Sequence, residues 1–186
     1  MPTIQISEEE LIKRINSIPK LLNPLTKRSI RPACRFYPGR AGIGIKIIGA
    51  HQGDSPDRDY RDWRFSTFVN DYRCMYHEYW KSDNGRDFYL INMSLSLFRV
   101  DRAKHDESEL LALHCDPEEP DDSKHAKYKR GPHIHVKAAE LPIPRAHITL
   151  TCGYLKNILS SYDSLLKAME WAIVMLKEQI LDQSVA

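Results

Sequence analysis

Five residues in the C-terminal half of the chain are of types that carry out acid-base or metal chemistry. They are His114, Asp116, His133, His135 and His147. Side chains alternate between the two faces of a strand, so the two histidines of "GPHIHV" point away from Ile134 and Val136. The same alternation in "AHITLTC" and "ELLALHCDP" gives His147 a polar face and places His114 and Asp116 together. Three strands can therefore present all five residues on one polar surface.

The first chemistry that fits such a surface is metal binding. His133 and His135, joined by His147, offer three imidazole nitrogens, which suit a divalent transition metal such as zinc. A site of this kind keeps one position open for water, and the bound water becomes a nucleophile near neutral pH.

The second chemistry needs no metal. One histidine deprotonates a nucleophile and another protonates the leaving group, while a cation stabilises the charge on a phosphate. In this interpretation His133 and His135 act as acid and base, with His147 as the third member and His114 beside them. Asp116 orients a histidine, and Arg130 or Lys137 holds the phosphate. RNA can be cut in this way because its own 2′-hydroxyl is the nucleophile.

A third interpretation is that these are ordinary surface histidines on a solvent-exposed sheet face. An isolated histidine is usually of that kind, whereas three at matched strand parity make a shared site more credible. The alternation itself is compatible with all three interpretations, so the deciding property is whether the rings converge on one centre.

The positive charge of the chain is concentrated near its N-terminus. Residues 11–50 hold nine Lys and Arg and no Asp or Glu, in a chain whose net charge is only +2. Clustered cations with aromatic neighbours such as Phe36 and Tyr37 suit contact with nucleic-acid phosphates. The predicted nucleic-acid-binding residues are Arg28, Arg31, Arg35, Arg40, Arg130 and Lys137. The alternative is a solvated surface whose charge is offset in space by the acidic segment 101–122.

The elements that must position these residues indicate an α+β fold, a mostly antiparallel sheet flanked by an N-terminal helix and a long C-terminal helix. Ser7 lies three residues before Glu10, a capping-box spacing, and the helix that follows is expected to end before Pro19. Residues 23–42 contain three prolines and are expected to be mostly irregular, whereas "GIGIKIIGA" has the pattern of a buried strand.

The rest of the chain continues this pattern. Residues 60–115 alternate in hydrophobicity, with the turn signal Asn84-Gly85 between two runs, and predict a β meander. The polar segment 116–131 predicts an exposed charged loop, and residues 132–152 the histidine-bearing strands. Residues 160–182 predict the C-terminal helix, capped by Ser160, with its Met and Trp residues in the core.

Length and composition predict a single domain over residues 1–186, whose basic N-terminal part is residues 1–50. The four cysteines are widely spaced and are expected to be small core residues. No apolar run is long enough to span a bilayer and no leader pattern is present, so we expect a cytoplasmic protein without a membrane partner.

The order of features resembles the small TumE-type toxins of bacterial toxin-antitoxin modules. The resemblance spans about residues 88–175, and its specific part is Asp116 with the group Gly131-Pro132-His133-Ile134-His135. The chain departs from the pattern in its length, its basic N-terminal part and the added "AHITL" strand. The resemblance implies a growth-inhibiting protein that acts on nucleic acid or translation and is held in check by a cognate antitoxin, with His133 and His135 as site residues.

The sequence thus predicts a toxin-like or defence-associated protein that acts on RNA or another phosphodiester, as a ribonuclease or other phosphodiesterase. The alternative is a non-catalytic binding or assembly subunit. Such a subunit would dock a protein or nucleic-acid partner through its basic face and the exposed strand 133–138, since unpaired strand edges are natural docking sites.

Overall fold

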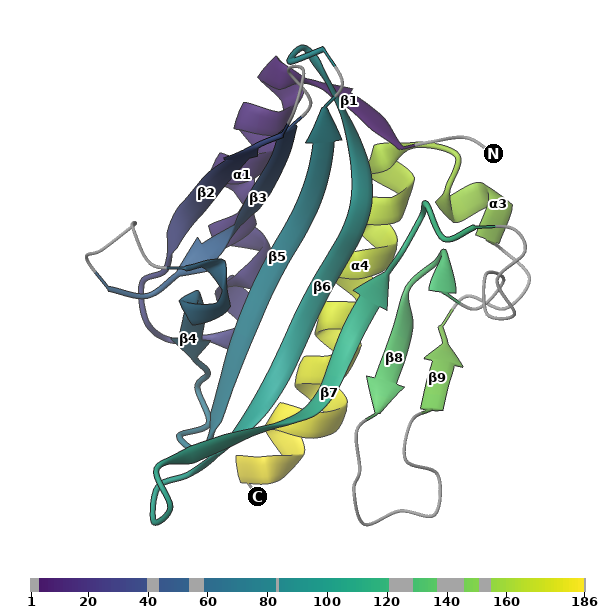
Figure 1. The fold of residues 1–186 in the computed structure, drawn as a ribbon. Coiled ribbons are helices and arrows are strands. Elements are labelled where there is room, and N and C mark those ends of the chain that lie inside the picture. The colour runs from purple at the N-terminus through teal and green to yellow at the C-terminus, as the bar shows by residue number, and fades with distance from the viewer. Residues whose placement is uncertain are drawn as a thin grey trace.

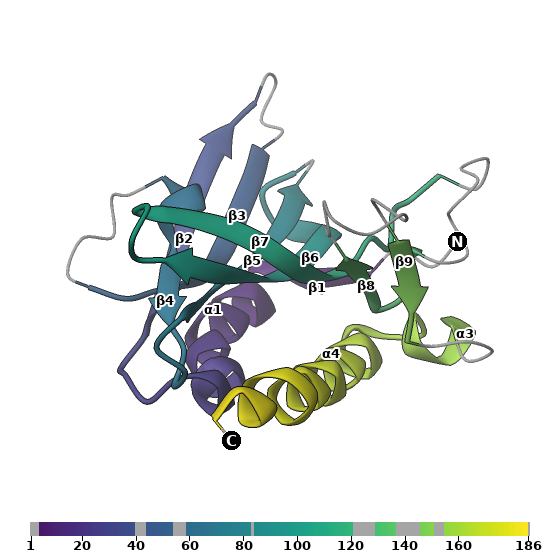
Figure 2. The ribbon, with the colours of Figure 1, turned by 90° about the horizontal axis from the view of Figure 1, so that it is seen from below.

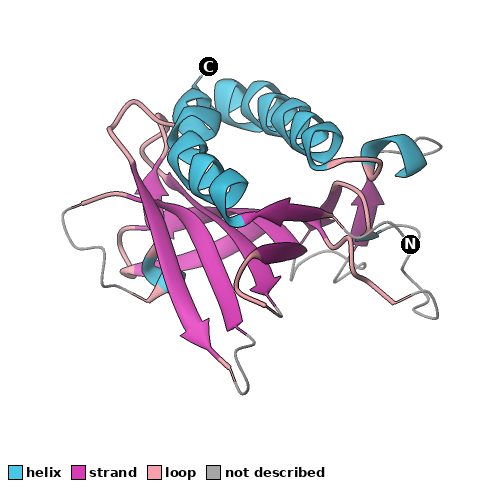
Figure 3. Cartoon of the chain, turned by 90° about the horizontal axis from the view of Figure 1, so that it is seen from above, coloured by secondary structure: helices cyan, strands magenta, loops and turns pink. Residues whose placement is uncertain are grey.

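The chain forms one antiparallel β-sheet with two long helices packed against one of its faces (Figures 1–3). The computed structural model describes residues 4–39, 44–53, 59–82, 84–120, 129–136, 146–150 and 155–185. This architecture confirms the α+β fold expected from the sequence.

Within the described residues, the sheet has nine strands in the order β2-β3-β5-β6-β7-β8-β9, with β1 added to β6 and β4 to β5. The strands are β1 (Gln5–Ser7), β2 (Arg31–Pro38), β3 (Gly44–His51), β4 (Arg64–Ser66), β5 (Tyr72–Ser82), β6 (Asp87–Asp101), β7 (Asp106–Cys115), β8 (His133–Val136) and β9 (Ala146–Thr149). The meander predicted over residues 60–115 is confirmed as β4 to β7. Because β8 pairs with both β7 and β9, it is not the exposed docking strand that the sequence suggested.

The helices come from both ends of the chain. They are α1 (Glu8–Leu22), α3 (Leu155–Ile158) and α4 (Tyr162–Leu176), with short 3-10 segments η1 (Asn23–Leu25) and η3 (Tyr60–Asp62). Two further turns extend α4, the π-helical η4 (Lys177–Leu181) and the 3-10 segment η5 (Asp182–Val185). Figure 2 shows α1 and α4 side by side on the same side of the sheet.

The main hydrophobic core lies between these helices and the sheet. Alternate residues of the strands point into it, for example Leu95 and Leu97 on β6, where they meet Leu11 of α1 and Met169 of α4. The opposite face of the sheet, which Figure 1 shows towards the viewer, carries no long helix and is called the helix-free face below. It is formed by the other set of alternate residues, including Ala33, Ile47, His77, Tyr79, Ser94, Ser96, Ala112, His114, His133 and His135.

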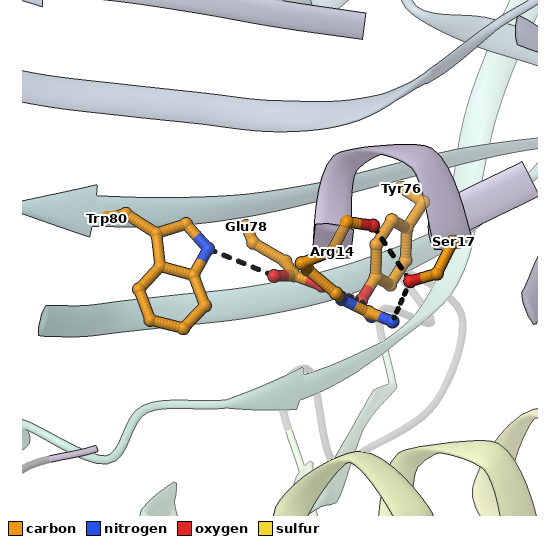
Figure 4. Close-up of polar contacts among 5 residues, drawn as sticks. All are labelled: Arg14, Ser17, Tyr76, Glu78 and Trp80. Carbon is orange, nitrogen blue, oxygen red and sulfur yellow. Dashed lines mark hydrogen bonds and ion pairs between the residues drawn. The ribbon is translucent and has the colours of Figure 1, made fainter. Parts of the chain in front are cut away.

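A buried ion pair joins α1 to the sheet (Figure 4). Arg14 Nε donates to Glu78 Oε1 at 2.8 Å, and both side chains are almost fully buried. The Tyr76 hydroxyl and Trp80 Nε1 also donate to the Glu78 carboxylate, and Arg14 reaches Ser17 within α1. Since every partner contributes a hydrogen bond, the two buried charges are compensated.

Helix α1 begins as predicted and ends later than predicted. The reciprocal hydrogen bonds of Ser7 and Glu10 form the capping box. The expected end before Pro19 is wrong, because the helix continues through Pro19 to Leu22. The missing donor at Pro19 costs one helical hydrogen bond, and burial of Ile18 and Leu22 in the core offsets that cost.

The prediction of irregular structure over residues 23–42 is also wrong, since residues 31–38 form β2. Pro32 and Pro38 lie in this strand, where they pair with Ala50 and Gly44 of β3. Strand β2 stands at the end of the sheet, and proline is tolerated on such an edge because half of its backbone groups need no strand partner.

Three local expectations about side chains differ from the structure. The cap of α4 is Ser161, whose hydroxyl accepts from the Ser164 amide, one residue beyond the predicted Ser160. Met169 is buried as expected, but Trp171 is 66 % exposed and therefore not a core residue. Cys34 is exposed on β2, although the sequence predicted a core position.

The remaining expectations are partly tested. Cys74 and Cys115 are buried as predicted. Half of the predicted loop 116–131, residues 121–128, lies outside the described residues, while its end at Arg130 and Gly131 is buried rather than exposed. In the described parts of the chain, no helix combines the length and the apolar character needed to cross a membrane.

Candidate functional site

The strand register places the predicted histidines on one face. His114 of β7 is opposite His133 of β8, which is in turn opposite Thr149 of β9. His135 of β8 is opposite His147 of β9. Since partners across a sheet point to the same side, the backbone carries all four histidine positions on the helix-free face. The side chain of His147 lies outside the described residues.

Three of these histidine rings lie close together. The ring centroid of His114 is 5.9 Å from that of His133 and 5.5 Å from that of His135. His114 of β7 therefore lies beside both His133 and His135 of the neighbouring strand β8, whose two rings point to the same face. These three residues are called the histidine cluster below.

Asp116 lies at the edge of the histidine cluster. Its Oδ2 is 3.9 Å from His133 Nε2, and its Oδ1 accepts a hydrogen bond from Asn92 of β6. The Asp116 amide also donates to the Lys129 carbonyl at 2.9 Å, which ties together the two ends of the segment between β7 and β8. Asn92 thus orients the carboxylate beside His133, and the Lys129 contact fixes the backbone of Asp116.

The hydrogen bonds of His133 define its tautomer. His133 Nδ1 is 3.0 Å from the Gly131 carbonyl oxygen. A carbonyl can only accept, so Nδ1 carries the proton and Nε2, on the Asp116 side, is the nitrogen that can take up another. The His133 side chain is 2 % exposed and that of Asp116 is 23 % exposed, so solvent reaches this pair through the carboxylate.

His114 is held in its neutral form. Burial, together with repulsion from His133 and His135 in their charged forms, lowers the pKa of His114 from 6.5 to about 4, although the nearby Asp116 opposes this. Its Nε2 lies 3.4 Å from the Ser94 hydroxyl of β6. At neutral pH the ring is therefore an uncharged spacer that contacts both of its histidine neighbours.

A further histidine, His77 of β5, lies in the same row and was missed by the sequence analysis. The register links His77 to Ser94 and Ser94 to His114, so the row crosses four neighbouring strands and ends at His133. Burial and the proximity of His114 lower the pKa of His77 to about 4. The signal was weak in sequence, because in "CMYHEYW" both faces of β5 carry large side chains and the alternation is obscured.

The predicted phosphate-binding cations that the structure describes, Arg28, Arg31, Arg35 and Arg130, do not place their guanidinium groups together at the histidine cluster. Arg130 is 6 % exposed, and its guanidinium donates to the Glu119 carbonyl at 2.6 and 2.9 Å, which is a structural contact. Arg28 lines a polar cavity of about 570 Å³ at the β6–β7 hairpin end of the sheet. Arg40 and Lys137 lie outside the described residues.

Arg31 and Arg35 are exposed on β2, at the far end of the sheet from β8. Five strand spacings separate β2 from β8, or roughly 24 Å. Other cations of the basic segment pair with acids elsewhere, including Arg14 with Glu78 and Lys46 with Glu8. Part of the early positive charge is thus offset in space, as the alternative interpretation expected. Two cations pair with Glu78 and Glu8, and Arg28 shares its cavity with acidic residues of the segment 101–122, namely Asp101, Asp106 and Glu107.

The described part of the chain contains no assembled metal-binding site. Within it, no group of three or more His, Cys, Asp or Glu side chains is close enough to hold a metal ion. The predicted set of His133, His135 and His147 includes one side chain that is not described, so it remains a prediction.

Comparisons of the chain with protein-family models, with curated proteins and with solved structures found no match. Its function is therefore inferred from the geometry of the helix-free face.

Proposed function

We propose that the protein acts on RNA or another phosphodiester by metal-free acid-base chemistry at the histidine cluster, in a toxin-like or defence-associated role. The observation that carries the proposal is the meeting of the His114, His133 and His135 rings beside the fixed carboxylate of Asp116. Histidines that share a face by chance have no reason to converge with an oriented acid.

His133 has the properties of a general base. Its Nε2 can take a proton from a 2′-hydroxyl, and the Asp116 carboxylate 3.9 Å away stabilises the charged ring that results. The 2′-oxygen then attacks phosphorus and the bond to the 5′-oxygen breaks, leaving a 2′,3′-cyclic phosphate. His135, in its protonated form, donates to the departing 5′-oxygen. His114 stays neutral and positions both rings.

The direct test is expression of the wild type and of a His133→Ala/His135→Ala variant in bacteria, with growth and RNA integrity as readouts. The wild type should slow growth and degrade RNA, and the double variant should do neither. Equal growth and equal RNA integrity for the two would refute the proposal.

Replacing the buried His133 can unfold the protein, so a second variant tests the site at a residue that is partly exposed. Asp116→Asn keeps the size of a partly exposed side chain, and we expect up to about 10⁴-fold slower cleavage, the cost of the same change at the aspartate that orients the catalytic histidine of Ser-His-Asp enzymes. The matched control is His105→Asn, on the exposed β6–β7 turn, where the positive φ of 52° suits asparagine. This control should behave as wild type.

A non-catalytic binding or assembly subunit is the second candidate. It is favoured by the burial of His133, which limits access to the ring, and by the exposed Arg31 and Arg35 on the edge strand β2. Metal analysis and co-purification separate the candidates. A partner that co-purifies stably with wild type and double variant alike, without RNA cleavage, would favour assembly. Stoichiometric metal lost in the double variant would favour the metal interpretation of the site.

A further inference from the structure

Three tyrosines from separate elements gather on the helix-free face at the β2 end of the sheet. The Tyr60 ring of η3 is 6.5 Å from that of Tyr37 on β2 and 5.6 Å from that of Tyr79 on β5, both edge to face. All three side chains are partly exposed. They pack on a small buried cluster of Ala33, Ile47 and Trp63 that is separate from the main core. Tyr37, Tyr60 and Tyr79 are called the tyrosine cluster below.

Arginines border the tyrosine cluster. The Arg35 guanidinium lies 5.6 Å from the centre of the Tyr37 ring, and that of Arg61 lies 5.7 Å from the centre of the Tyr60 ring. Both arginines are exposed, as is Arg31 at the start of β2. Arg61 also contacts Asp59 at 3.3 Å, an exposed pair that is screened by water. Partly exposed tyrosine rings therefore share this surface with exposed guanidinium groups, two of which lie over the rings.

The tyrosine cluster is continuous with the row of histidines. The His77 ring is 5.0 Å from Tyr79 and 5.9 Å from Tyr60, and the strand register leads from His77 through Ser94 to His114. Three strand spacings separate β5 from β8, or roughly 14 Å. A single extended ligand laid across the strands can therefore reach both clusters.

Two buried polar atoms lie where the clusters meet. Trp63 Nε1 and His77 Nδ1 have no hydrogen-bond partner in the part of the chain that the structure describes. Trp63 is fully buried and His77 is 9 % exposed. Buried polar groups without a protein partner cost free energy, and their presence in a native fold calls for a functional or solvent explanation.

We infer that the tyrosine cluster binds unpaired bases of a single-stranded nucleic acid, while Arg31, Arg35 and Arg61 contact its phosphates. The strand then crosses the sheet towards the histidine cluster, so the inference names the substrate of the proposed function and rests on it. Bases stack on aromatic rings whatever their sequence, and bordering cations add affinity for the backbone. Charge complementarity selects a polyanion, and stacking selects one with exposed bases.

The test uses a labelled single-stranded DNA of about 12 nucleotides, within the usual site size of single-strand binding domains. DNA lacks the 2′-hydroxyl, so binding is measured without cleavage. Fluorescence anisotropy should show about 10-fold weaker binding by Tyr37→Ala and by Tyr60→Ala in the full-length protein. Tyr60→Phe retains the ring and should bind as wild type.

The matched control is Phe36→Ala. Phe36 neighbours Tyr37 on β2, is 52 % exposed and points to the opposite face of the sheet, beside Gly44. It should leave binding unchanged. Equal losses for Phe36→Ala and Tyr37→Ala, equal affinity for duplex and single-stranded DNA, or full competition by polyglutamate would overturn the inference.

The outcomes also separate this inference from the proposed function. Tyrosine-dependent binding together with uncut RNA would retain the binding surface and reject the chemistry. RNA cleavage that needs His133 but is insensitive to Tyr37→Ala and Tyr60→Ala would retain the chemistry and reject the surface.

Discussion

Two imidazoles of the row, His77 and His114, tie the stability of the protein to pH. Their pKa values fall from 6.5 to about 4 on folding, because burial disfavours the charged ring. Below pH 6.5 the unfolded chain takes up protons that the folded chain binds only near pH 4. The free energy of unfolding should therefore be greatest above pH 6.5 and fall between pH 6.5 and 4, by up to about 3 kcal/mol per histidine.

Urea denaturation at several pH values between 4 and 8 measures this dependence. In His77→Gln the fall should be shallower, because one group that is neutral in the fold and charged in the unfolded chain has been removed. The same slope for wild type and variant would show that His77 is not held neutral by the fold.

For single residues, the alternation of side chains along a strand was sufficient to predict that His133 and His135 share a face. The observed strand register also pairs His135 with His147, as the sequence suggested. The alternation was not sufficient to find His77 or to place Arg130. His77 is brought to the row only by the pairing of β5 with β6, and Arg130 is buried by a contact with the Glu119 backbone. Both depend on contacts between distant segments, which local alternation does not encode.

At the scale of elements, α1 tolerates a proline in its interior at a measurable cost. Pro19→Ala restores the donor that can bond the Ile15 carbonyl, and it should raise the free energy of unfolding by about 1–3 kcal/mol, after allowance for the more flexible unfolded chain. Chemical denaturation measures the change.

Pro24→Ala is the matched control for this substitution. Pro24 follows the C-cap of α1 and lies outside the body of that helix, so its replacement should bring a smaller gain. A gain as large as that of Pro19→Ala would mean that the missing hydrogen bond in α1 is not the cause.

Elements with a strong periodic pattern were predictable, and those stabilised by their surroundings were not. The capping box, the Asn84-Gly85 turn and the alternation of β6 are all local signals. The strand β2 contains two prolines and was predicted to be irregular, yet its pairing with the buried β3 makes it a strand. The extension of α1 past Pro19 has the same origin in tertiary packing.

At the scale of the whole molecule, the Arg14–Glu78 pair joins the N-terminal helix to the centre of the sheet. Arg14→Met leaves the buried Glu78 carboxylate without its cation and should lower the free energy of unfolding by about 3–5 kcal/mol. Arg14→Met/Glu78→Gln should be clearly more stable than Arg14→Met, because the uncompensated charge is gone. Urea denaturation of the three proteins checks both statements, and equal stability of the two variants would contradict them.

The face of the sheet that forms the hydrophobic core is not the face that carries the residues of the proposed chemistry. The helices cover one face of the sheet and form the core with it, and the row of histidines lies on the other. The sequence predicted this division from the amphipathic helices and alternating strands. It did not predict that the basic β2 and the histidine cluster stand at opposite ends of the sheet, because strand order is set by long-range pairing.

Metal-free cleavage at the histidine cluster can be measured with purified protein and an end-labelled single-stranded RNA in the presence of EDTA. The wild type should release fragments that end in a 2′,3′-cyclic phosphate and leave DNA of the same sequence intact. His133→Ala/His135→Ala should release about 100-fold less, the usual effect of losing acid-base groups. Undetectable cleavage by the wild type, or equal cleavage by the two proteins, would contradict the account.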